Sequence, residues 1–339
     1  MKRVLLEFRR KGRIGLMDEF GNTIVQPEFR YASCSIDGTV EVSTFTDGFG
    51  FLDSTSLELK MVPGWQSSGV LANGLVAVRR SGGTYDDPEG YMDVNGELII
   101  EARFIGAGSF DKFGANVGIF GNPNVRHRID FSGKVLGDEF SQIRPFHTNG
   151  MACGAQLQSS NWMVPITATG MRIGKNVYKT VWQEHEGKIP VEFENDVVGW
   201  LDIDGKVMAK FRAFGIGNHF QNGLVPVQNF EGDWGLMNTA EEWVVDPAFD
   251  YIEAVGDNRF ASGNRHSPGN LRMRLFDSQG TRIGEHEFGM IYRFYEGFAN
   301  VEMAIPSDEG AEYGYAPSNY IDRNGNLVSN DWSDPIFSN

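Results

Sequence analysis

Short runs of apolar residues alternate with polar residues along most of the chain and predict its elements. Segments such as 39–43 (TVEVS) and 75–79 (LVAVR) alternate apolar and polar positions and are rich in β-branched residues. This pattern is typical of half-buried strands. Helical periodicity is nearly absent, so the pattern predicts an all-β protein.

One apolar run recurs along the chain and ends each time at an acid or a substitute for it, which we call the anchor. The copies read GLMD, GFLD, GYMD, HRID, WMVP, GWLD, GLMN, RLFD and NYID, with anchors at Asp18, Asp53, Asp93, Asp130, Pro165, Asp202, Asn238, Asp277 and Asp322. Successive anchors are 35 to 45 residues apart, a period that is typical of repeat architectures. We therefore expect a single array over residues 1–339 with about nine units, of which the fifth, at 157–190, is irregular.

Two glycines keep register with the anchors. One lies three residues past the anchor in six of nine copies, as in DIDGK at Gly205. This segment predicts a hairpin turn, because Asp hydrogen-bonds its own backbone and Gly accepts a positive φ. The other glycine lies about 20–22 residues past the anchor and opens a further apolar run, as Gly223 does in GLVPV; Arg259 takes its place in the seventh copy. Each unit of about 37 residues is thus predicted to form three strands.

The architecture follows from the need to cover an apolar face. A single unit of this kind cannot bury its own apolar side, so neighbouring units must stack. Three-stranded units fit an open superhelical array, whereas four-stranded blades fit a closed β-propeller. Three clear strands per unit and nine units favour the open array, with the closed propeller as the alternative.

The order of these landmarks resembles a known family. Gly-aromatic-apolar-Asp, then x-x-Gly-Lys/Glu/Asn, an aromatic stretch and a Gly-led apolar run are similar to the WG-containing (KWG) repeat of bacterial proteins. The resemblance covers residues 11–328, and the Trp-Gly pair is literal at Trp234–Gly235. It implies a β-rich repeat scaffold, and it does not imply one particular activity.

Charge and composition narrow the partners. The formal net charge is −15 and the pI is about 4.9, which disfavours a nucleic-acid partner and suits a basic protein. No apolar run is long enough for a secretion signal or a membrane helix, so we expect a cytoplasmic protein without a membrane partner. Cys34 and Cys153 do not occupy equivalent repeat positions, and reduced, buried thiols are expected.

No familiar catalytic or metal-binding motif is complete. The segment DIDG at Asp202–Gly205 lacks the remaining ligands of a calcium loop. The six His have no second ligand at metal spacing, and Gly-x-Ser-x-Gly is absent. We therefore expect no metal, no cofactor and no enzymatic activity.

These features favour a non-catalytic protein-binding scaffold, in a sharper version an immunity or antitoxin-type protein that neutralises a basic partner. The alternative is a carbohydrate-binding or hydrolytic protein with a groove of aromatics and acids. Polar insertions at 79–90, 262–270 and 302–313 are candidate contact loops, since insertions in repeat arrays often share one face. The candidate binding residues are Tyr85, Asp86, Asp87, Trp182, Asp308, Glu309 and Glu312.

Overall fold

The computed structural model describes residues 4–35, 38–46, 48–146, 150–158, 160–265, 271–303 and 317–329. Over these residues it contains antiparallel strands and no helix, which confirms the all-β prediction. None of them forms a helix that could cross a membrane. The chain divides into two compact units, one of residues 33–212 and one of residues 1–32 with 213–339.

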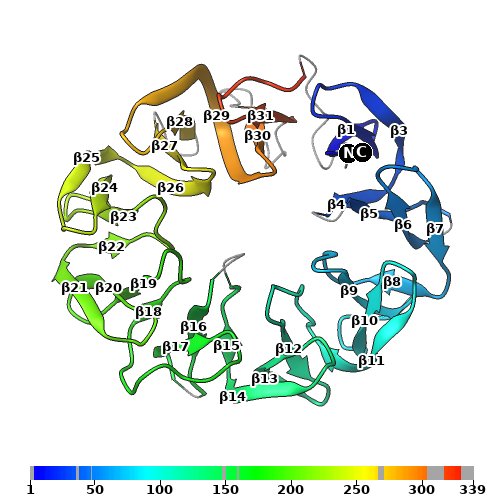
Figure 1. The fold of residues 1–339 in the computed structure, drawn as a ribbon, viewed down its shortest axis with the longest axis horizontal. Coiled ribbons are helices and arrows are strands. Elements are labelled where there is room, and N and C mark those ends of the chain that lie inside the picture. The colour runs from blue at the N-terminus through cyan, green and yellow to red at the C-terminus, as the bar shows by residue number, and fades with distance from the viewer. Residues whose placement is uncertain are drawn as a thin grey trace. The chain divides into compact units, whose positions relative to one another are not determined.

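In the unit 33–212, each strand pairs with the next strand along the chain, so every sheet is a meander (Figure 1). The first sheet contains β4 (Tyr31–Cys34), which begins just before the unit does, β5 (Thr39–Ser43), β6 (Phe49–Asp53) and β7 (Leu59–Val62). The second contains β8 (Trp65–Ser67), β9 (Leu75–Arg80), β10 (Glu89–Asp93), β11 (Leu98–Ile105), β12 (Ala115–Ile119), β13 (Asn122–Ile129) and β14 (Val135–Phe140). The third contains β15 (Gln142–Ile143), β16 (Ala152–Gln156) and β17 (Met163–Thr167), and the fourth β18 (Thr180–Val181), β19 (Ile189–Glu192), β20 (Val197–Leu201) and β21 (Val207–Arg212).

The unit of residues 1–32 and 213–339 is also built from meanders. One sheet contains β1 (Leu6–Arg10), β2 (Arg13–Met17) and β3 (Thr23–Phe29). Another contains β22 (Gly215–Ile216), β23 (Leu224–Gln228), β24 (Trp234–Asn238) and β25 (Trp243–Phe249). The largest contains β26 (Tyr251–Gly256), β27 (Arg259–Arg265), β28 (Leu271–Phe276), β29 (Arg282–Tyr295), β30 (Phe298–Met303) and β31 (Ser318–Asp322).

The centre of each repeat is a hairpin that the sequence period divides between two units. The strand after the second glycine pairs with the strand that ends at the following anchor, so that Leu224 lies opposite Asn238. We call this pair of strands the anchor hairpin and its connecting loop the tip loop. The three strands predicted for one period therefore belong to two sheets. Several sheets also gain a short strand, such as β22, that the apolar pattern did not predict.

The turn after the anchor has the predicted form. Asp202 Oδ1 accepts hydrogen bonds from the backbone N–H of Asp204 at 3.0 Å and of Lys206 at 2.9 Å, and Gly205 has a φ of 82°. The same pair of bonds forms at Asp18, Asp93, Asp130, Asn238, Asp277 and Asp322. At Asp130, the Ser132 hydroxyl and these backbone donors hold the pKa of the carboxyl below its usual value.

Two landmarks read from the sequence were placed wrongly. In the fifth copy the anchor is Thr167, not Pro165, because Thr167 Oγ1 accepts from Met171 N at 3.1 Å and Gly170 N donates to the Thr167 carbonyl. In the seventh copy Asn258, not Arg259, stands at the second glycine position and has a φ of 56°. Thr and Asn carry out these roles because a hydroxyl can replace the carboxylate and Asn tolerates the left-handed region.

A close backbone approach explains the glycine three residues before the anchor. A β-carbon at Gly199 would lie 2.1 Å from the Ala209 carbonyl oxygen, and one at Gly90 would lie 2.3 Å from that of Ile100. Equivalent approaches occur between Gly15 and Val25, Gly50 and Lys60, and Gly235 and Val245. In each pair the carbonyl belongs to the residue seven positions after the anchor. Any side chain at the first position would collide with backbone.

Three copies solve the same problem from the other strand. His127, Val164 and Arg274 stand where the other copies have glycine, and in these copies glycine occurs seven positions after the anchor. These are Gly137, Gly174 and Gly284, with φ values of 64°, 68° and 70°. A left-handed residue there redirects the backbone of the opposing strand. Each of these eight copies therefore has a glycine in one of the two facing positions.

Successive copies are packed through the turn glycines and the apolar faces. A β-carbon at Gly133 would lie 2.7 Å from Ile100 of the preceding copy, and one at Gly280 would lie 2.6 Å from Val245. One buried cluster joins Phe49 and Val62 of one copy to Val76 and Met92 of the next. Stacking of neighbours thus supplies the core, as a repeat scaffold requires.

The first and last copies are also neighbours within their unit. Strand β1 contacts β31, and a β-carbon at Gly21 would lie 2.8 Å from the Val328 carbonyl oxygen. An open array would place its two terminal copies at opposite ends. The expected open array is therefore not confirmed.

Both cysteines are free, as expected, but they differ in burial. Cys153 is fully buried, and burial raises the pKa of its thiol well above the usual value. Cys34 is only half-buried, so the expectation of a buried thiol is wrong for that residue. It lies at the end of β4, an edge strand of its sheet.

We predict that Gly199→Ala destabilises the protein by about 2 kcal/mol or more, because the added methyl overlaps the Ala209 carbonyl. A second substitution, Ala209→Gly, should restore part of this loss by allowing the backbone course seen at Gly137. The free energy of unfolding from urea titrations measures both effects. Gly215→Ala is the control, since its β-carbon would make only ordinary contacts from 3.4 Å. A double variant no more stable than Gly199→Ala would contradict the explanation.

A buried carboxyl in β5 generates a prediction about pH. Glu41 is 0% exposed and accepts a hydrogen bond from Leu71 N at 3.0 Å, and burial raises its pKa above 4.5. Because the folded pKa exceeds the unfolded one, stability from this group is greatest below the unfolded pKa and falls as pH rises through the folded pKa. We expect Glu41→Gln to gain stability relative to wild type between acid and neutral pH in urea titrations. A difference that stays constant with pH would contradict this assignment.

Candidate functional site

The three polar insertions occupy the same place in the repeat. Residues 79–90 include the tip loop between β9 and β10, residues 262–270 the loop between β27 and β28, and residues 302–313 the loop between β30 and β31. Each is the tip loop of an anchor hairpin. Asp308, Glu309 and Glu312 fall in the last of these loops and lie outside the described residues.

The meander places tip loops and turns at opposite edges of a sheet. In an antiparallel sheet whose strands follow chain order, alternate connections lie at the same edge. The turns after the anchors therefore share one edge with the second glycines, and Ser54 N donates to the Gly38 carbonyl at 2.9 Å across these two connections. The tip loops lie at the other edge, so every insertion extends the same edge of its sheet.

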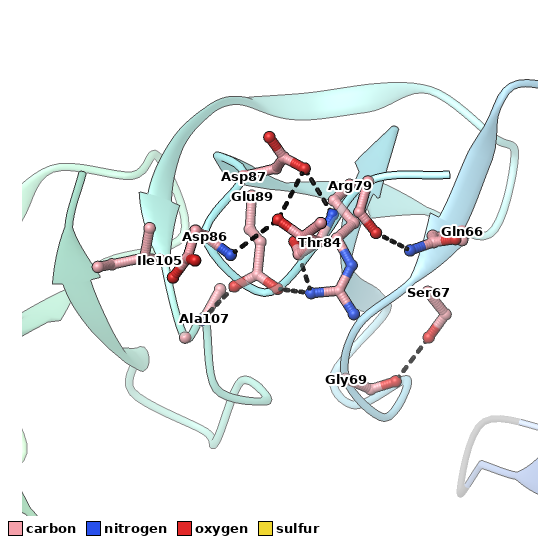
Figure 2. Close-up of polar contacts among 12 residues, drawn as sticks. Gln66, Ser67, Gly69, Arg79, Thr84, Asp86, Asp87, Glu89, Ile105 and Ala107 are labelled. Atoms are coloured by element: carbon pink, nitrogen blue, oxygen red, sulfur yellow. Dashed lines mark hydrogen bonds and ion pairs between the residues drawn. The ribbon is translucent and has the colours of Figure 1, made fainter. Parts of the chain in front are cut away.

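The tip loop between β9 and β10 is closed at its base by a buried ion pair (Figure 2). Arg79 is 8% exposed and Glu89 3%, and Arg79 Nη1 lies 3.5 Å from Glu89 Oε1. Glu89 Oε2 accepts from Ala107 N at 2.7 Å, and Arg79 Nη1 donates to the Thr84 carbonyl at 3.3 Å. The pair thus joins both ends of the loop and attaches them to the segment after β11.

Further hydrogen bonds order the interior of this loop. Asp87 Oδ2 accepts from Thr84 N at 2.5 Å and from the Thr84 hydroxyl at 3.3 Å. Gln66, on the neighbouring strand β8, donates to the Gly83 carbonyl at 3.3 Å and accepts from Gly82 N at 3.4 Å (Figure 2). The loop is therefore held in one conformation despite its length.

Tyr85 and Asp86 stand at the exposed end of this ordered loop. Tyr85 is 86% exposed, and the Arg79 guanidinium lies 4.7 Å from the centre of its ring. The Asp86 side chain is also exposed, while Asp87 serves as the hydrogen-bond acceptor inside the loop. The structure therefore brings together three of the predicted binding residues and gives them different roles.

Trp182 lies apart from the tip loops. It follows β18 on the connection to β19, at the edge that carries the turns. Its ring is half-buried under the Arg144 guanidinium, 4.1 Å away, and its backbone N–H donates to Pro190 O at 3.0 Å. Burial lowers the pKa of Arg144. These contacts make Trp182 a packing residue, so the structure does not place it with Tyr85 in one site.

Exposed aromatic side chains recur in other tip loops and were not singled out from the sequence. Phe45 is 56% exposed, Phe120 53% and Phe230 51%, and each follows the first strand of its anchor hairpin, as Tyr85 does. Phe45, Tyr85 and Phe230 all lie eight residues before their anchors. That shared offset is the signal that sequence reasoning could have used.

The tip loops also share a charge pattern. Residues 44–48, 81–88, 193–196 and 229–233 contain no Lys or Arg, and their acids are Asp47, Asp86, Asp87, Glu194, Asp196, Glu231 and Asp233. At the opposite edge, lysines follow the turn glycine, as Lys134 and Lys206 do. The aromatic edge of these sheets is thus also the acidic one.

A pocket of about 630 Å³ lies elsewhere in the unit 33–212. Its lining is Arg103, Phe104, Ile119, Ser132, Gly133, Lys134 and Val135. The lining includes two cations and no carboxylate. This pocket therefore does not supply the paired acids that a hydrolytic groove requires.

Comparison with known proteins identifies one repeat. Residues 234–261 match the family model of the WG containing repeat, and this match confirms the resemblance seen at Trp234–Gly235. No curated protein matches the chain.

Solved structures show distant likenesses. BamB from Moraxella catarrhalis has a TM-score of 0.44 at 10% identity, over 90% of this chain and 96% of that one. Dihydro-heme d1 dehydrogenase NirN in complex with DHE has 0.45 at 10% identity, over 84% and 73%. KlHsv2 with loop 6CD replaced by a Gly-Ser linker has 0.40 at 10% identity, over 88% and 98%. At these scores the likenesses do not decide between an open array and a closed ring.

The buried pair below Tyr85 generates a prediction. Glu89→Ala leaves Arg79 buried without its carboxylate and removes the acceptor for Ala107 N, so we expect a loss of about 3 kcal/mol in the free energy of unfolding. Glu287→Ala is the matched control, because its pair with Arg274 is more than 30% exposed on both sides and should contribute less than about 1 kcal/mol. Equal losses in the two variants would show that the Arg79–Glu89 pair does not brace the loop.

Proposed function

We propose that this protein, a β-repeat scaffold that contains a WG-containing repeat, binds a protein partner with a basic surface. The observation that carries the proposal is the edge of exposed aromatics and acids formed by the tip loops. Tyr85, Phe45, Phe120 and Phe230 are each more than half exposed. Aromatic side chains are enriched where proteins bind proteins, because they contribute large contact areas at small conformational cost.

Charge supports a basic partner. The formal net charge of −15 attracts a cationic protein over long range and disfavours phosphate backbones. The tip loops concentrate this charge beside the aromatics, where Asp86 follows Tyr85 and Glu231 follows Phe230. Complementary charge of this kind raises the association rate and selects between partners. An immunity or antitoxin role would be one case of this function, in which the bound partner is toxic.

Affinity capture tests the proposal. The tagged protein, incubated with a lysate of its source cell, should retain a basic protein in stoichiometric amount, and high salt should release that protein because the attraction is screened. An unrelated tagged protein of similar size and net charge is the control for unspecific retention. Capture of no stoichiometric partner, or of an acidic partner only, would contradict the proposal.

A further inference from the structure

We propose that the tip loops of the unit 33–212 are a recognition surface for an extended, arginine-containing segment of the partner, with Tyr85 and Asp86 as its best-formed subsite. This inference rests on the proposed function and specifies where and how the partner binds. The loops concerned are 44–48, 81–88, 120–121 and 193–196. Each connects the two strands of an anchor hairpin in the same unit.

The position of the insertions is the first argument. The close approach between Gly199 and Ala209, and its equivalents, leaves no room for variation in the anchor hairpin itself. The chain instead varies in its tip loops, and all three polar insertions occur there. In repeat proteins, insertions that share one face commonly form the binding face.

The preparation of the Tyr85 loop is the second argument. The Arg79–Glu89 pair, the Asp87 carboxylate and the Gln66 amide fix a loop whose tip holds an 86% exposed tyrosine. Burying an ion pair costs desolvation, and here it orders a surface element rather than the core. A rigid exposed aromatic loses little entropy on binding, which is the property of a binding anchor.

The chemistry of the loops selects arginine as the complementary group. A guanidinium can stack on the Tyr85 ring and approach the Asp86 carboxylate, so that one side chain satisfies both the aromatic and the acid. Arginine stacks on aromatic faces better than lysine does because its guanidinium is planar and weakly hydrated. The neighbouring loops offer the same pairing of chemical types, with Phe193 followed by Glu194 and Asp196.

The protein itself uses this contact repeatedly. Arg80 lies 4.0 Å from the Trp65 ring, Arg144 lies 4.1 Å from the Trp182 ring, and Arg79 lies 4.7 Å from the Tyr85 ring. Arg79 is only 8% exposed, whereas the Tyr85 ring it approaches is almost fully exposed. Most of the ring surface is therefore open to a second guanidinium from a partner.

The test measures binding of a short fluorescent peptide of alternating Gly and Arg by anisotropy, with Gly-Lys and Gly-Glu peptides for comparison. Wild-type protein should bind the arginine peptide most tightly and the glutamate peptide not at all. Tyr85→Ala should raise Kd roughly three- to tenfold, the effect of losing one cation–π contact. Tyr85→Phe keeps the ring and should stay within about twofold of wild type. Asp86→Asn should weaken binding at low salt and have little effect at high salt.

The matched control is Phe20→Ala. Phe20 is 75% exposed, but it lies in the turn after Asp18, at the edge opposite the tip loops, so its removal should leave Kd unchanged. Thermal unfolding of each variant checks that the fold is retained. The inference is overturned if Tyr85→Ala binds like wild type, if Phe20→Ala weakens binding as much as Tyr85→Ala does, or if no variant distinguishes arginine from lysine.

The outcomes also separate this inference from the proposed function. If the arginine peptide does not bind while a basic protein is still captured from lysate, the partner uses another surface and only the inference falls. If neither binds, both fall.

Discussion

The structure depends on one steric constraint in the anchor hairpin, where the anchor strand and the strand after the turn approach backbone to backbone. In five copies a glycine such as Gly199 accepts the opposing carbonyl, and in three copies a glycine such as Gly137 redirects the opposing strand instead. Either arrangement lets the strands approach closely, and the turn carboxylates then fix the next strand in place. The constraint therefore holds both the hairpin geometry and the spacing of successive copies.

Function follows from where this constraint ends. Turns and strands cannot change without a collision, but the tip loops are free to lengthen and to change composition. They hold exposed aromatics and acids, whereas the opposite edge is occupied by turns that pack on the preceding copy, as Gly133 does on Ile100. The Arg79–Glu89 pair shows that a long tip loop can still be rigid. A scaffold with one constrained edge and one variable edge suits binding rather than catalysis.

Much of the fold was predictable because period and turn chemistry are local properties. The anchors at Asp93 and Asp202 and the turn glycines follow from residue type alone. The two-residue strand β22 was missed because no apolar alternation can show in so few residues. Thr167 was missed as an anchor because the search required an acid, although Thr can accept the same hydrogen bond.

The candidate site was predictable in part, for a different physical reason. Tyr85 and Asp86 were found because an insertion marks them, while Phe45 and Phe230 sit in loops of ordinary length. Trp182 was included because of its residue type, but its burial against Arg144 depends on a strand 38 positions away and cannot be read from the sequence. Arg128 illustrates the same limit: it is 1% exposed and paired with Asp111 at 2.7 Å, a state that composition alone does not predict for an arginine.

Amide hydrogen exchange of the whole protein, alone and saturated with the arginine peptide, tests the central claim most directly, because it reports every edge of every sheet at once. The account predicts slower exchange on binding in the tip loops 81–88 and 193–196, with the turns after Asp93 and Asp202 unchanged. Protection confined to those turns, with the tip loops unaffected, would contradict the assignment of the variable edge as the binding edge.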